Sequence, residues 1–233
     1  QSEDHSVFNR DHVKYWDGTF FHNENEGISY IIKEGGDILP ITVFTGVDTA
    51  TDIKRRDSDY SVLITVGIDS YNRIYVLDYV RKRGLPVLGI QANEEKGIVD
   101  HIFEINEAYK PSLFTIEDTT MSRPVFQSLK SEMMRRNSFT VKYKEEKPGT
   151  RQSKRDRIQS ILAQRFSVGQ IYIKKEHYDL HREIITFGPR MAHDDTIDAL
   201  AYACLYAHSD SNIKSENGVY KKSSPVPKSW VVA

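Results

Sequence analysis

At residues 60–80 the sequence reads YSVLITVGIDSYNRIYVLDYV, two runs of β-branched and aromatic residues on either side of a polar pentapeptide. Such runs separated by a turn predict two antiparallel strands, Tyr60–Ile68 and Ile74–Val80. The upstream run Ile41–Val47 has the same character. The three segments together therefore predict an antiparallel meander of three strands.

Beyond the meander, helical and strand patterns alternate along the chain. Apolar residues at helical spacing predict helices, and short apolar runs predict strands. The expected helices cover residues 93–108, 123–136, 154–166 and 194–207, and the expected strands cover 113–116, 139–143 and 170–173. This order predicts an α/β fold in which a mixed central sheet has helices on its faces. Ribonuclease H-like folds share the order, which alone assigns no function.

The two ends of the chain differ from this central part in composition. Residues 1–40 are polar with scattered aromatic side chains, and we expect them to form a lead-in or linker that packs on the core. Residues 209–233 are rich in Ser, Lys and Pro, which predicts a flexible tail. The expected folded domain thus spans residues 41–208.

Length and composition limit the fold and the function. The chain has 233 residues and one cysteine, Cys204, so it can bury a core without disulfides and cannot form a disulfide framework. It has no apolar run of about 18 residues, and we expect neither a membrane span nor a membrane partner. The first ten residues lack the apolar centre of a signal peptide. Because the chain begins with Gln1 and not Met, we expect it to be a fragment or a processed chain.

Charge is unevenly distributed, although the formal net charge is only −1. Residues 123–157 carry eleven basic and four acidic side chains. A basic segment on a neutral chain is what a protein needs when one face meets a polyanion such as nucleic acid. A solvated, lysine-rich surface is the alternative interpretation.

Carboxylates stand at the ends of two expected strands. Asp48 follows the first strand directly, and Glu117 follows the strand at 113–116, with Asp118 next to it. Because side chains alternate along a strand, Glu117 and Asp118 cannot both face one site. We favour Glu117 and expect Asp118 to cap the following helix. The alternative for each strand-end acid is an ordinary turn residue.

A third acidic group opens the last expected helix, where residues 193–200 read HDDTIDAL. Asp194, Asp195 and Asp198 share neighbouring parts of one helix face. Three acids so close repel one another, and a bound cation would relieve the repulsion. Oxygen ligands without a Cys/His set favour Mg²⁺ or Mn²⁺ over zinc. Two such ions promote phosphodiester displacement, so the predicted reaction class is metal-assisted nucleic-acid hydrolysis.

Four segments together resemble a known family. They are GVDTATDIKRRDSDYSVLITVG at 46–67, FTIEDTTMSRPVFQSLKSE at 114–132, SKRDRIQSILAQRFSVGQIYI at 153–173 and HDDTIDALAYA at 193–203. In that order they resemble the C-terminal nuclease domain of the large terminase subunit of tailed bacteriophages, over about residues 43–207. The resemblance implies a ribonuclease H-like fold and an endonuclease that cuts concatemeric viral double-stranded DNA in the host cell cytoplasm, on the procapsid.

The resemblance also implies roles for individual acids. Asp48 matches the first catalytic, metal-binding acid, and Glu117 matches the acid at the end of the central strand. The pair Asp195 and Asp198 matches the acid on the last helix. Which of these two or Asp194 binds the metal stays open at this point.

Three further residues match family positions with less specificity, and His193 is a separate candidate. Asp59 matches an additional acidic position, with a solvent-facing acid as the alternative. For His193 we favour a structural histidine at the helix start, and the alternative is a residue that orients a ligand or water. Lys154 and Arg157 match a basic helix start that would contact DNA phosphate, and the loop 144–152 would lie against the duplex. The alternative for the two cations is a solvated helix face.

The sequence lacks the phosphate-binding motif G-x-x-x-x-G-K-[ST] of an ATPase motor. We therefore expect a nuclease module that is joined in the full-length protein to an N-terminal ATPase domain, with the portal protein and the small terminase subunit as partners. Two other functions remain: another ribonuclease H-like nuclease, such as a Holliday-junction resolvase, and a non-catalytic module that docks on DNA or portal.

Overall fold

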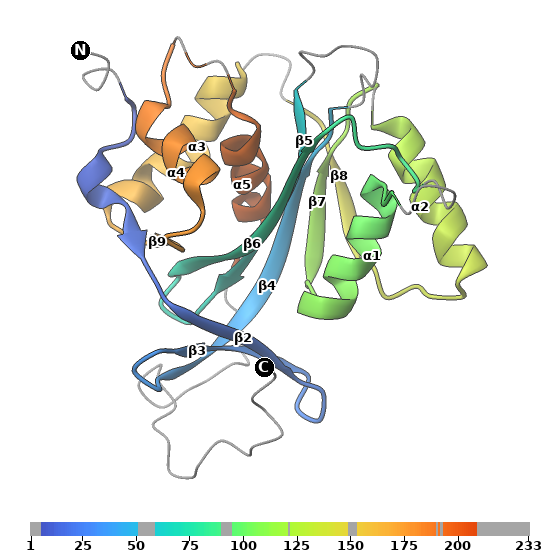
Figure 1. Ribbon diagram of the computed structural model, residues 1–233, viewed down its shortest axis with the longest axis horizontal. Helices are drawn as coiled ribbons and strands as arrows, with labels where there is room; N and C mark the ends of the chain where they lie inside the picture. Colours follow the sequence, from blue (N-terminus) through green and yellow to red (C-terminus); the bar gives the residue numbers. More distant parts are fainter. Residues whose placement is uncertain are drawn as a thin grey trace.

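The computed structural model describes residues 6–50, 59–89, 95–120, 122–148, 153–189, 191 and 193–208. A mixed sheet runs through the molecule with helices on both of its faces (Figure 1). The strands are β1 (Lys14–Tyr15), β2 (Gly18–Asn23), β3 (Ile28–Lys33), β4 (Ile38–Asp48), β5 (Tyr60–Ile68), β6 (Ile74–Arg83), β7 (Leu113–Glu117), β8 (Tyr143–Glu146) and β9 (Ile171–Ile173). The helices are α1 (Ile98–Tyr109), α2 (Arg123–Arg135), α3 (Lys154–Ser167), α4 (Tyr178–Thr186) and α5 (Asp195–Leu205), with a 3₁₀ turn at Arg10–His12.

The sheet combines antiparallel and parallel pairs, as the sequence predicts. Its order is β1-β9-β6-β5-β4-β3-β2, with β7 paired to β4 and β8 paired to β7. The meander β4-β5-β6 is antiparallel, whereas β7, β8 and β9 join in parallel. The parallel register pairs Val47 with Ile116, so the next residues, Asp48 and Glu117, lie side by side where the two strands end.

Helices cover the sheet because its strands are apolar on both faces. In β5, Ile64 belongs to the core beneath α3, α4 and α5, and its neighbour Leu63 belongs to the core beneath α1 and α2. Side chains of consecutive strand residues point to opposite faces, so a strand buried on both sides is a continuous apolar run. That explains the uninterrupted pattern at residues 60–68.

Helix α5 packs closely on β4, and Gly46 permits the approach. A Cβ atom at Gly46 would lie 2.0 Å from the Ala199 carbonyl oxygen and 2.4 Å from the Ala203 nitrogen. Any larger residue at Gly46 would push the helix away. Because residues two apart share a face of a strand, Asp48 also faces α5. The glycine therefore brings the end of β4 against the start of the helix.

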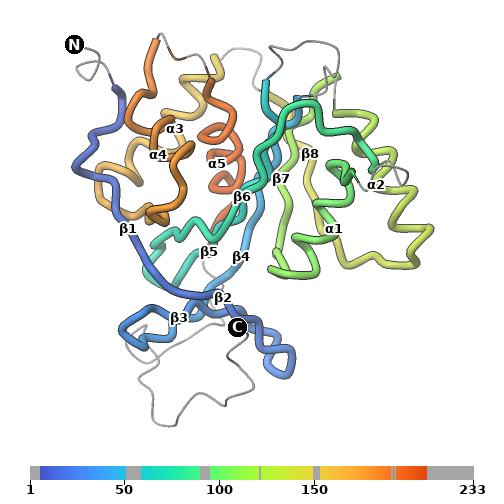
Figure 2. Tube along the Cα trace, viewed as in Figure 1, coloured from blue at the N-terminus to red at the C-terminus, as the bar shows by residue number. Residues whose placement is uncertain are grey.

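Residues 1–40, predicted as a lead-in, contribute three strands to the sheet. In the trace of Figure 2, the chain passes from β1, which pairs with β9, to the β2–β3 hairpin, and β3 pairs with the first part of β4. Trp16 and Ile31 are buried with Tyr75 in a core of their own, and the Trp16 indole donates to the Val76 carbonyl at 3.1 Å. The domain boundaries at residues 40/41 and 208/209 stay predictions.

Other differences concern element boundaries. The strand expected at 139–143 is β8, which begins only at Tyr143, and Phe139 is 64% exposed. The sequence analysis assigned no element to α4, whose buried side is short. Asp118 was expected to cap α2, but the N-cap residue is Ser122, and no side-chain cap hydrogen bond is present among the described residues.

Some expectations fall partly or wholly on residues that are not described. The predicted tail at 209–233 lies outside the described residues, and so do residues 149–152 of the loop expected to face DNA. Within the described ranges, no helix has the length and apolar character needed to cross a membrane.

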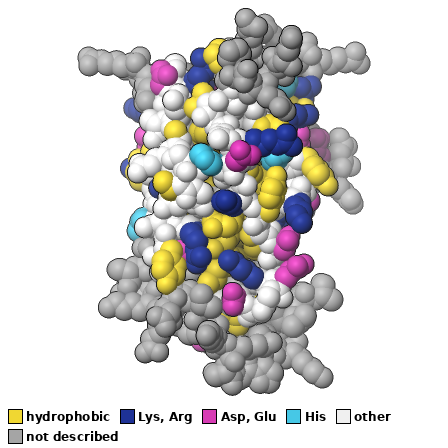
Figure 3. Space-filling model, turned by 90° about the vertical axis from the view of Figure 1, so that its left-hand side faces the viewer, with side chains coloured by type: hydrophobic (Ala, Val, Ile, Leu, Met, Phe, Trp, Pro, Cys, Tyr) yellow, Lys and Arg dark blue, Asp and Glu magenta, His cyan; other side chains and the backbone are white. Residues whose placement is uncertain are grey.

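Basic side chains are present beyond the segment 123–157. Figure 3, viewed from the side of α4 and β9, shows Lys and Arg side chains among hydrophobic ones. Tyr178 at the start of α4 is 77% exposed, Tyr15 in β1 is 44% exposed, and Lys175, between β9 and α4, is exposed too. Positive charge is thus spread over more of the surface than the sequence segment alone indicates.

Candidate functional site

Four carboxylates converge where β4 and β7 end against the start of α5. Asp48 is the last residue of β4, and Glu117 is the last residue of β7. Asp195 and Asp198 lie in the first turn of α5. Asp48, Asp195 and Asp198 are buried, with Asp198 fully so, and Glu117 is half-buried. The structure thus brings together all four acids that the sequence analysis singled out as metal-binding residues.

The ammonium group of Lys154 lies among the aspartates. Its Nζ is 2.9 Å from Asp194, 3.2 Å from Asp198, 3.5 Å from Asp48 and 3.9 Å from Asp195, measured to the nearest carboxylate oxygen. Lys154 is the first residue of α3, and its side chain remains 40% exposed. One cation already sits within reach of four carboxylates, at a position open to solvent.

Arg157 lies one turn along α3 on the same side of the helix. Its guanidinium donates to both oxygens of Asp198, at 2.6 and 2.8 Å, and is 3.7 Å from Glu117. It also lies over the Tyr202 ring, 4.5 Å from the centroid. Lys154 and Arg157, predicted to contact DNA phosphate, therefore point at carboxylates in this structure. Their contact with DNA remains a prediction.

Tyr202 is a site residue that the sequence analysis did not name. Its hydroxyl donates to Glu117 Oε1 at 2.9 Å, and the side chain is buried. Tyr202 follows Asp198 by four residues, a spacing that places both on one helix face. That spacing was the available signal, but an apolar helix face explained the tyrosine equally well.

Electrostatics make the cluster receptive to cations. Burial raises the pKa of Asp48 well above its usual value, and the nearby acids Asp198, Glu117 and Asp195 add to the rise while Lys154 opposes it. Burial also raises the pKa of Asp195 and of Asp198. Burial lowers the pKa of Lys154, but the carboxylates around it outweigh that effect, and its pKa is raised.

The donor set fits a divalent metal ion. All four predicted ligands offer carboxylate oxygens, the donors that Mg²⁺ and Mn²⁺ prefer. The Lys154 ammonium lies within 3.9 Å of three of them, Asp48, Asp195 and Asp198, so these oxygens already surround a cation. A hard divalent ion in the same place would offset more of the negative charge than one ammonium group does.

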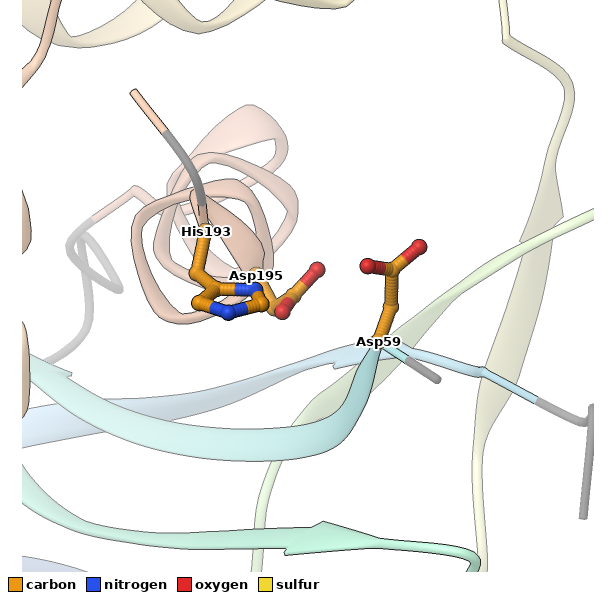
Figure 4. Close-up of side chains that lie close together, drawn as sticks. All are labelled: Asp59, His193 and Asp195. Atoms are coloured by element: carbon orange, nitrogen blue, oxygen red, sulfur yellow. The ribbon is translucent and has the colours of Figure 1, made fainter. Parts of the chain in front are cut away.

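Two further residues extend the cluster on the side of β5. Asp59, His193 and Asp195 each offer a ligand atom, and these atoms lie within 4.8 Å of one another (Figure 4). Asp195 also accepts the Tyr60 backbone N–H at 3.1 Å. His193 Nε2 lies 3.4 Å from Arg83, and its Nδ1 is buried without a hydrogen-bond partner among the described residues. Asp59 and His193 therefore lie beside Asp195, close enough to orient a ligand held by the neighbouring acids.

Replacement of Lys154 tests whether the acids need a cation. Lys154→Met is expected to lower the free energy of unfolding of the metal-free protein by about 1–2 kcal/mol, because the aspartates lose a counter-ion that is partly screened by water. Added Mg²⁺ is expected to restore most of the loss. Thermal unfolding with and without Mg²⁺ measures both effects, and Lys175→Met on the exposed surface is the control. Equal, Mg²⁺-insensitive changes in the two variants would contradict the expectation.

The family model described as terminase RNaseH-like domain matches residues 45–207. Solved structures similar to this chain include T. thermophilus RuvC in complex with a Holliday junction substrate, at 18% identity over 70% of this chain and 91% of that chain, with a TM-score of 0.39. The P22 large terminase nuclease domain has 9% identity, coverages of 84% and 89%, and a TM-score of 0.46.

The yeast mitochondrial Holliday junction resolvase Ydc2 has 11% identity to this chain, with coverages of 69% of this chain and 76% of that chain and a TM-score of 0.40. No curated protein matches the sequence.

Proposed function

Because the chain belongs to the terminase RNase H-like domain family, we propose that it is a metal-dependent endonuclease that cuts concatemeric double-stranded viral DNA during genome packaging. The observation that carries the proposal is the convergence of carboxylates from β4, β7 and α5 on two neighbouring cations: Lys154 lies within 3.9 Å of Asp48, Asp195 and Asp198, and Arg157 lies 3.7 Å from Glu117. Structural acids at strand ends need not meet, whereas a hydrolytic metal site requires that they do.

In this proposal Asp48, Glu117, Asp195 and Asp198 are the metal-binding and catalytic acids. Bound Mg²⁺ or Mn²⁺, as two ions, would supply an activated water and stabilise the leaving oxygen of the phosphodiester. The chain itself supplies fixed positions for the ligands: Gly46 lets α5 lie against β4, and Tyr202 holds the Glu117 carboxylate by a hydrogen bond.

Lys154 and Arg157 are proposed to contact the DNA phosphate at the scissile bond. Both cations stand at the carboxylate cluster, and the Lys154 side chain is accessible from solvent. Cations that neutralise phosphates position a duplex without reading its sequence. We therefore propose that cleavage has low sequence specificity.

The wider setting is proposed from the family. In the full-length protein an N-terminal ATPase domain would deliver the DNA, and the portal protein and the small terminase subunit would be partners at the procapsid in the host cytoplasm. The chain has no phosphate-binding motif of its own, so translocation is assigned to that other domain.

The test is cleavage of supercoiled plasmid and of a four-way DNA junction by the purified chain in Mg²⁺, Mn²⁺, Ca²⁺ or EDTA. We expect nicking and linearisation of plasmid in Mg²⁺ and Mn²⁺, and none in EDTA, because carboxylates alone do not activate water for this reaction. Cleavage confined to the four-way junction would replace the proposal with a resolvase. A folded protein that cuts neither DNA in any metal would indicate a docking module.

A further inference from the structure

The start of helix α5 has an unusual cap. The first backbone N–H groups of a helix lack partners within the helix and need acceptors from elsewhere. The N-cap residue is Asp194, but among the described residues its side chain makes no cap hydrogen bond. Its carboxylate instead lies 2.9 Å from the Lys154 ammonium. An acid well suited to capping is therefore turned toward the cation position.

Glu183, on the neighbouring helix α4, accepts those N–H groups instead. Its Oε2 accepts from the backbone nitrogens of Thr196 at 2.8 Å and Ile197 at 2.9 Å, and its Oε1 accepts from the Thr196 hydroxyl at 2.8 Å. Glu183 is only 2% exposed. A carboxylate at this place also interacts favourably with the positive end of the helix dipole. These bonds offset part of the cost of burying its charge.

Arg81 connects Glu183 with Tyr60, which contacts Asp195. Its guanidinium lies 3.4 Å from Glu183, and its Nε donates to the Thr196 hydroxyl at 3.1 Å. The same guanidinium stacks on the Tyr60 ring, 3.3 Å from the centroid. The Tyr60 backbone N–H in turn donates to Asp195. Glu183, Arg81 and Tyr60 thus form a continuous set of contacts with the first turn of α5.

We propose that Glu183 is a positioning residue for the metal-binding acids of α5, an inference that rests on the proposed nuclease function. The backbone groups it holds, those of Thr196 and Ile197, lie between Asp195 and Asp198 in the chain. By fixing this turn, Glu183 sets the direction of both carboxylates and leaves Asp194 available to the cation. An apolar residue in its place would leave the helix start to recruit Asp194 as its cap.

The test compares Glu183→Gln with the wild-type protein in two assays, Mn²⁺ affinity by calorimetry and the rate of plasmid cleavage. A glutamine has one acceptor oxygen, so if that oxygen keeps the two backbone N–H groups, its NH₂ group faces the Thr196 hydroxyl, which can no longer donate to it. The negative charge at the helix start is also lost. We expect Mn²⁺ affinity and cleavage rate each to fall about 10-fold, the lower end of what losing an outer-sphere partner of a metal site costs. Glu176→Gln, at an exposed glutamate just before α4, is the matched control and should change neither.

Thr196→Val tests the same inference if Glu183→Gln does not fold. It removes the hydroxyl that both Glu183 and Arg81 contact while it preserves the side-chain shape, and we expect about a threefold loss in both assays, in keeping with a weaker outer-sphere change. Unchanged Mn²⁺ affinity in the folded variants, even with lowered thermal stability, would reduce Glu183 to a structural residue and overturn the inference. A wild-type protein that binds Mn²⁺ but cuts no DNA would overturn the proposed function instead.

Discussion

Asp48→Asn is expected to lower the rate of plasmid cleavage by about 1,000-fold, because it removes one charged ligand from the proposed metal site. Asp48 is buried at the end of β4 and lies 3.5 Å from the cation position marked by Lys154. Asparagine has nearly the same shape, so the effect would come from the missing charge. Single-turnover cleavage in Mg²⁺ measures it.

The fold of the Asp48→Asn variant is expected to survive. Burial and neighbouring acids raise the pKa of Asp48, which means that its charge is unfavourable in the metal-free protein. Neutralising the residue therefore relieves repulsion, and the melting temperature without metal should not fall. Asp17→Asn, at an exposed aspartate between β1 and β2, is the matched control. If Asp48→Asn cut at more than a tenth of the wild-type rate, Asp48 would not be a ligand.

The acids of α5 are expected to differ strongly in importance. Asp198→Asn should lower cleavage by about 1,000-fold, whereas Asp194→Asn should lower it by about 10-fold. Asp198 is fully buried and is held by both Lys154 and Arg157, while the side chain of Asp194 is 33% exposed and contacts Lys154. Cleavage rates of the two variants under the same conditions measure the difference.

Stability must be measured alongside, because Asp198 is the partner of Arg157. The guanidinium is 12% exposed, and Asp198→Asn leaves it without a charged partner, but burial raises the pKa of Asp198 and so offsets part of that cost; we expect a net loss of about 1 kcal/mol of unfolding free energy. Assays well below the melting temperature of Asp198→Asn separate this cost from the loss of catalysis. A larger loss of cleavage in Asp194→Asn than in Asp198→Asn would identify Asp194 as the metal ligand. The sequence left open which of these aspartates binds the metal.

Several features of the fold were predictable from local patterns. The meander, the mixed sheet and the helices that begin at Arg123 and Lys154 agree with the structure, because hydrophobic period and turn residues depend on near neighbours in the chain. The family resemblance is confirmed by the match over residues 45–207. The strands at 14–33 were missed because their burial depends on distant partners such as Tyr75, not on their own alternation.

The candidate site likewise has residues that local sequence predicts and others that depend on distant contacts. Acids directly after Val47 and Ile116, and at the start of the last helix, can be read from the order of residues, since a strand or helix end places its next side chain at the sheet edge. Glu183 could not be found in this way. Its role depends on α4 packing against α5, and α4 is a helix of only nine residues to which the sequence analysis assigned no element.

Sequence order alone placed carboxylates at the ends of β4, β7 and the start of α5, because those positions follow from local periodicity. Their approach to one another required Gly46 beneath Ala199, a contact between residues far apart in the chain. The direction of Lys154 was likewise a property of the folded molecule. The same side chain on an isolated helix would face water, and it turns inward because its attraction to the aspartates outweighs the cost of desolvating the ammonium group.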